Sequence, residues 1–65
     1  MIKYKGYTIL KSRGHWYVKC KSHKGLYIPL WTYDGCLRTI RDIASNVRSE
    51  GGYALSTKEE MERGE

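Results

Sequence analysis

The spacing of apolar residues changes at Asp34, and this change constrains the fold more than any other feature of the sequence. Before Asp34, apolar and polar residues alternate in three segments separated by glycine-containing turns, a pattern that predicts β-strands. After it, apolar residues recur every three or four positions, which predicts an amphipathic helix ending at Gly51-Gly52. We therefore expect an α+β fold in the order β-β-β-α, a three-stranded antiparallel sheet packed on one C-terminal α-helix.

The expected strands cover residues 4–11, 15–21 and 26–31, and Thr32 or Asp34 is expected to cap the helix. A chain of 65 residues can bury only about 60% of its unfolded surface, so one small domain is expected, over residues 1–56. Residues 57–65 contain one apolar side chain, Met61, and are expected to form a polar, flexible tail.

Alternation along the expected strands assigns their side chains to two faces. Trp16, Val18 and Cys20 are expected to face the helix, which leaves the residues between them on an open face. Tyr7 and Ile9 are likewise expected on the helix side, as are the alternate residues of the third strand, Leu26, Ile28 and Leu30. The open face should then be basic and aromatic.

Positive charge is concentrated in the first half of the chain. Seven Lys and Arg residues precede the first acidic residue, Asp34, and the formal net charge is +5. Lysine side chains neutralise phosphates and aromatic rings offer flat surfaces, so this combination predicts nucleic-acid binding, with duplex DNA as the first candidate and RNA as a second. The residues expected to contact it are Lys11, Arg13, His15, Tyr17, Lys19, Lys21, Lys24 and Tyr27.

The same residues resemble a known group of domains. Over about residues 3–55 the sequence resembles the ethylene-response-factor type DNA-binding domain of plants. The resemblance is carried by Lys3-Tyr4-Lys5-Gly6, by Gly14-His15-Trp16-Tyr17-Val18 and by residues 25–34, which lead into the helix. The arm-binding domains of phage integrases share this form, which makes a phage protein conceivable. The resemblance implies that the sheet enters the major groove, with Tyr17, Lys19, Lys21 and Tyr27 in contact. Because Lys replaces the family's usual Arg, phosphate contacts are expected rather than guanine recognition.

An alternative function is protein binding. A small phage-type protein could use the same basic and aromatic surface to inhibit or modulate a host protein, with Trp31 and Tyr33 as an aromatic anchor. Pairing of two copies through a sheet edge is a third alternative. A monomer or a weak dimer is expected.

Catalysis, metals and cofactors are not expected. Asp34 and Asp42 are two helical turns apart, too far to share a proton. Cys20 and His23 have the spacing of half a zinc site, but Cys20 is expected in the core, so Cys20 and Cys36 are expected to be buried thiols. No apolar run reaches about 18 residues and the first residues lack a signal-peptide core, so a cytoplasmic protein with no membrane partner is expected.

Overall fold

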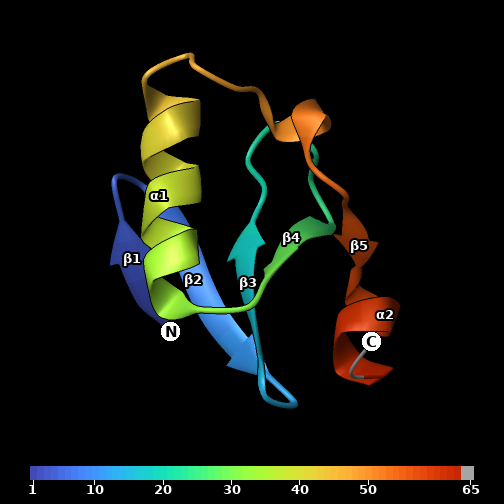
Figure 1. Ribbon diagram of the computed structural model, residues 1–65. Helices are drawn as coiled ribbons and strands as arrows, with labels where there is room; N and C mark the ends of the chain where they lie inside the picture. Colours follow the sequence, from blue (N-terminus) through green and yellow to red (C-terminus); the bar gives the residue numbers. More distant parts are fainter. Residues whose placement is uncertain (64–65) are drawn as a thin grey trace.

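The computed structural model describes residues 1–63, which form a five-stranded antiparallel sheet and two α-helices (Figure 1). The long helix packs on one face of the sheet and the short helix on the other. The strands lie in the sheet in the same order as in the chain. The α+β class is confirmed, but the prediction of a three-stranded sheet is wrong. The strands are β1 (Ile2–Tyr4), β2 (Tyr7–Ser12), β3 (His15–Lys19), β4 (Leu26–Leu30) and β5 (Ser56–Thr57).

The first additional strand results from a tight turn at Lys5 and Gly6. Both residues have positive φ, 50° and 83°, as a two-residue hairpin turn requires. The chain therefore reverses inside the strand expected over residues 4–11, and Tyr4 pairs with Tyr7. Arg13 and Gly14 repeat these angles in the turn between β2 and β3.

The second additional strand, β5, leads into a short helix, α2 (Lys58–Arg63). Ser56 of β5 pairs with Tyr27 of β4. The amide of Thr57 donates to Glu60 Oε1 at 2.9 Å, and the amide of Glu60 donates to Thr57 Oγ1 at 3.2 Å, a reciprocal capping arrangement. Residues 57–63 thus take regular structure where a flexible tail was expected, and the last two residues of that tail lie outside the described part of the chain.

The long helix α1 (Tyr33–Ala44) begins where the sequence predicts and ends earlier. Thr32 is the N-cap, because its hydroxyl accepts from the amide of Gly35 at 3.0 Å. At the other end Ser45 and Asn46 stop the helix, Asn46 with φ 60°, a conformation that Asn tolerates. Gly51-Gly52 instead belongs to a separate 3-10 turn, η1 (Glu50–Gly52).

The main core lies between α1 and the sheet (Figure 1). Ile9, Val18 and Ile28 face each other across β2, β3 and β4, and all three are fully buried against Cys36 and Ile40 of α1. The predicted inward positions of Tyr7, Ile9, Trp16, Val18, Cys20 and Ile28 are confirmed, as are two buried free thiols. Over residues 1–63, neither helix is long and apolar enough to cross a membrane.

Candidate nucleic-acid interface

The face of the sheet opposite α1, called the outer face below, is the one predicted to be open. Strand pairing arranges its residues in rows across the sheet. Ser12 and His15 lie at the end formed by the β2–β3 turn, and Lys19 lies at the opposite end of β3. The middle row contains Leu10, Tyr17 and Pro29, and the row at the Lys19 end contains Thr8, Lys19 and Tyr27.

The middle of the outer face is covered by α2. Met61 is 5% exposed and packs in one cluster with Tyr17, which is 1% exposed, and Tyr27, which is 9% exposed. The side-chain hydroxyl of Ser12 donates to the Met61 carbonyl at 3.1 Å, and Arg13 Nε donates to the Glu62 carbonyl. The prediction that Tyr17 and Tyr27 are exposed contact residues is therefore wrong, because alternation assigns a side chain to a face without showing what covers it.

Three of the predicted lysines meet at the other end of the sheet. A surface hollow of about 560 Å³ lies beside the β3–β4 loop, and Tyr27 forms part of its wall. Lys19, Lys21 and Lys24 are all exposed, and none of the residues lining the hollow is acidic. We call this feature the lysine hollow; it is lined by Lys19, Cys20, Lys21, Lys24, Gly25 and Tyr27.

The β3–β4 loop is held tightly by its own backbone. The amide of Cys20 donates to the carbonyl of Leu26 at 3.1 Å, and the amide of Leu26 donates to the carbonyl of His23 at 3.1 Å. Gly25 has φ +85°, a conformation that favours glycine. The loop therefore keeps Lys21 and Lys24 near the end of β3.

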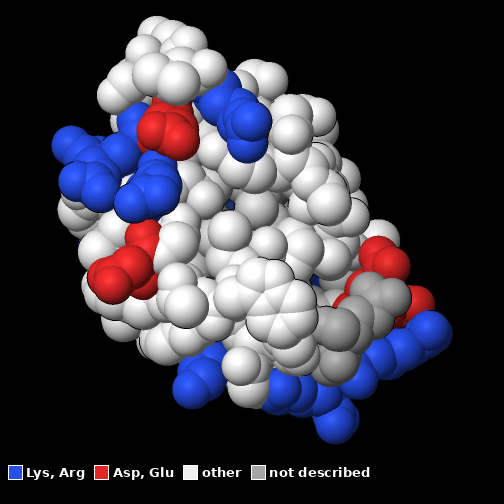
Figure 2. Space-filling model, in the orientation of Figure 1, with Lys and Arg blue, Asp and Glu red and all other residues white. Residues whose placement is uncertain are grey.

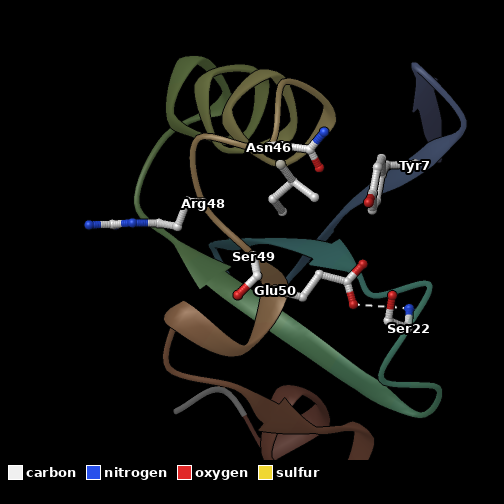
Figure 3. A pocket seen from close by; sticks show the side chains of 7 residues that line it. Tyr7, Ser22, Asn46, Arg48, Ser49 and Glu50 are labelled. Atoms are coloured by element: carbon white, nitrogen blue, oxygen red, sulfur yellow. Dashed lines mark hydrogen bonds between the residues drawn. The ribbon is translucent and has the colours of Figure 1, made fainter.

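A buried carboxylate holds the same loop from inside. Glu50, 4% exposed, accepts from the successive amides of Lys21, Ser22 and His23 at 3.0, 3.0 and 3.2 Å. His23 Nδ1 lies 3.2 Å from Glu50 Oε1. A second pocket, of about 330 Å³, lies beside Glu50 and is lined by Tyr7, Ser22, Ile43, Asn46, Arg48, Ser49 and Glu50. Figure 3 shows the Glu50 side chain reaching toward Ser22 in this pocket, whereas Arg48 points away from it. Successive amides of this kind form a favourable site for an anion. The Glu50 carboxylate occupies this site and so links η1 to the β3–β4 loop.

These contacts and burial shift the pKa values of Glu50 and Tyr7. Burial alone would raise the pKa of Glu50, but the hydrogen bonds from Lys21, His23 and Ser22 outweigh it and leave the pKa below its ordinary value. Burial, followed by the charge of Glu50 and a hydrogen bond to it, raises the pKa of Tyr7. Glu50 holds the loop that borders the lysine hollow. The sequence does not indicate this contact, because nothing local distinguishes Glu50 from an exposed acid before Gly51-Gly52.

The three lysines differ in how freely they can bind a ligand. Lys21 Nζ lies 4.5 Å from the centre of the Tyr7 ring, a cation–π contact. Lys19 and Lys24 form no salt bridge with any described residue. They are therefore the two cations of the hollow most available to an anionic ligand.

The other predicted contact residues lie at the opposite end of β3, at the β2–β3 turn. Lys11 is exposed, with its Nζ 5.2 Å from the centre of the Trp16 ring, and Arg13 is exposed in the turn. His15, half-buried, lies edge-on to Trp31 at 5.7 Å between ring centres. His15 and Lys19 are four residues apart, about 13 Å along a strand. The predicted basic residues thus lie near the two ends of β3, with the covered Tyr17 between them and with Lys11 on the face that α1 covers.

The basic residues of α1 do not form a third basic group, because acidic residues lie among them. On the side of the molecule that carries α1, acidic side chains lie next to basic ones (Figure 2). Arg38, Arg41, Asp34 and Asp42 all belong to this helix. Mixed charge of this kind is typical of a solvated surface.

The expected aromatic pair Trp31 and Tyr33 is separated in the structure. Tyr33 packs against the core and lies 5.4 Å from Trp16 between ring centres, whereas Trp31 is 85% exposed. Within residues 1–63, no three His, Cys, Asp or Glu side chains are close enough together to hold a metal ion.

Comparison of the chain with protein families, with curated proteins and with solved structures finds no match.

Proposed function

We propose that this protein binds nucleic acid through its phosphate backbone, with Lys19 and Lys24 of the lysine hollow as the principal contacts. The observation that supports this most directly is the hollow itself, which three exposed lysines line and no acidic side chain lines. Lysine ammonium groups bind phosphates as point charges and release counterions, which favours binding without base recognition. Arg13, in the β2–β3 turn, would hold a further part of the backbone.

The cover of α2 changes how a duplex would be held. A bare sheet could enter a major groove, but α2 lies over the middle of the outer face and contains Glu59, Glu60 and Glu62. His15 and Lys19, at the two ends of β3, are about 13 Å apart along the strand, close to the width of the major groove. We therefore propose that the protein contacts phosphates on both sides of a groove, and that the sheet itself does not enter the groove.

Protein binding is less well supported by the geometry. Its expected anchor pair is divided, because Tyr33 packs on Trp16 and only Trp31 is exposed. A complex with a single host protein that survives nuclease treatment would nevertheless favour that alternative over ours.

A salt titration of binding to duplex DNA tests the proposal. The double variant Lys19→Glu/Lys24→Glu should bind at least about tenfold more weakly at low salt, and the slope of log affinity against log salt should decrease by about 2, one unit per lost phosphate contact. Arg38→Glu/Arg41→Glu, on α1, has the same change in net charge and is the matched control. Equal losses in the two variants, or no binding by the unmodified protein at low salt, would contradict the proposal.

A further inference from the structure

Trp31 is an exposed aromatic side chain with a hollow beside it. It follows β4 directly, is 85% exposed, and lies edge-on to His15. Trp31, His15, Pro29 and Leu30 line a surface hollow of about 240 Å³. An indole left in water at this extent offers a large apolar surface that a ligand could cover. We call this hollow the Trp31 site.

We propose that the Trp31 site binds one unpaired nucleobase, which stacks on the indole of Trp31. This inference rests on the proposed nucleic-acid function and specifies its ligand more closely. All four bases present a flat π-face, so an aromatic side chain can stack with any of them. A base inside a duplex is covered on both sides by its neighbours, so only a base that has left the stack can reach the site.

The charges around the site favour a nucleotide over an uncharged aromatic ligand. Arg13 lies two residues before His15, in the exposed β2–β3 turn. Lys11 pairs with Trp16 and so lies on the other face of the sheet, the one that α1 covers. None of the residues that line the hollow is acidic. A phosphate next to a stacked base would therefore have Arg13 at the same end of the sheet.

The proposal can be tested by comparing oligothymidine with an abasic strand of the same length, since both have the same phosphates and only one has bases. Trp31→Ala should weaken binding of oligothymidine roughly tenfold and leave binding of the abasic strand unchanged, because stacking contributes to the first alone. Trp31→Phe retains a ring and should recover most of the loss. Val47→Ala, which shortens an exposed side chain in another part of the chain, is the control and should bind both strands normally.

Fluorescence gives an independent measurement. In a Trp16→Phe variant, whose fold is checked by circular dichroism, Trp31 is the remaining tryptophan. Its emission should be quenched by oligothymidine and not by the abasic strand. An equal effect of Trp31→Ala on both strands, or no effect on either, would overturn the Trp31 site and leave the phosphate-binding proposal intact. Failure of both strands and of duplex DNA to bind at low salt would overturn the proposed function itself.

Discussion

Met61 of α2 packs against Tyr17 of β3 on the face of the sheet opposite α1. Tyr17 is 1% exposed, as thoroughly buried as the residues of the main core. The sheet therefore has apolar clusters on both faces, and the C-terminal helix is part of the fold. This contact also decides which basic residues remain available to a ligand, because it separates Lys19 from the β2–β3 turn.

Replacing Met61 should destabilise the domain although the residue lies in the last turn of a short helix. Met61→Ala is expected to lower the free energy of unfolding by about 2–4 kcal/mol, the usual cost of removing a buried Met side chain. Urea denaturation followed by tyrosine and tryptophan fluorescence measures it. Glu59→Ala, on the exposed side of α2, is the control; equal stability of the two variants would show that α2 does not pack on the outer face.

Replacing Glu50 should loosen the β3–β4 loop. Glu50→Gln removes the charge that the amides of Lys21, Ser22 and His23 bind, and an amide side chain cannot accept all of their hydrogen bonds. We expect a loss of about 2 kcal/mol in the free energy of unfolding. The exposed Glu59→Gln should change it by less than about 0.5 kcal/mol. Hydrogen exchange at the amides of residues 21–23 should be faster in Glu50→Gln alone, and unchanged protection there would contradict the role assigned to Glu50.

The lowered pKa of Glu50 predicts the direction of a pH effect. The folded state binds this proton less readily than the unfolded state, so the contribution of Glu50 to stability is complete above its ordinary pKa of 4.5. It is lost as the pH falls through the lower pKa of the folded state. The difference in stability between the unmodified protein and Glu50→Gln should therefore be constant near neutral pH and shrink below about pH 4.5. A difference that grows on acidification would contradict this prediction.

The part of the fold that the sequence predicts is the part where two patterns agree. Alternation in β3 and β4 and the three- and four-residue spacing in α1 assign Val18, Ile28 and Ile40 to the same core, and the structure buries all three fully. Thr32 is predictable as an N-cap because its side chain interacts within its own turn. Local interactions and the hydrophobic pattern are sufficient for these elements.

The missed elements depend on weaker or distant signals. Lys5 and Gly6 form a hairpin turn without the Asn or Asp usual at its first position, so the sequence predicts one strand over residues 4–11 and does not separate Tyr4 of β1 from β2. The capping pair Thr57 and Glu60 is visible in the sequence, but a helix of six residues is stable only through the packing of Met61.

Only part of the candidate interface is predictable from the sequence. Lys19 and Lys24 lie close together because a short loop connects two paired strands, and that loop can be recognised from the sequence. The link between Glu50 and the amides of residues 21–23 joins positions 27 to 29 residues apart. No local pattern indicates such a contact, since it forms only after η1 has packed beside the loop.

Both cysteines should be unreactive in the folded protein. Burial raises the pKa of Cys36 to about 11, and burial followed by the charge of Glu50 raises the pKa of Cys20 to about 11. At pH 8 only about one thiol in a thousand would be ionised, and access is blocked as well. Modification by a thiol-reactive disulfide reagent should be slow without denaturant and rapid for both groups in urea. Fast labelling of one thiol in the native protein would contradict the buried position given for it.

The turn at Arg13 and Gly14 allows the cost of a positive φ to be measured without a change in side-chain packing. Gly14 has φ +83°, and a Cβ added there would meet no atom within 4 Å, so Gly14→Ala changes the backbone preference alone. We expect a loss of about 1 kcal/mol or more in the free energy of unfolding, because alanine is disfavoured at positive φ. Gly51→Ala is the control, since φ there lies outside that range and the nearest atom, in His23, is 3.9 Å from the added Cβ. Urea denaturation of both variants measures the difference, and equal stability would show that the turn does not hold the positive φ assigned to it.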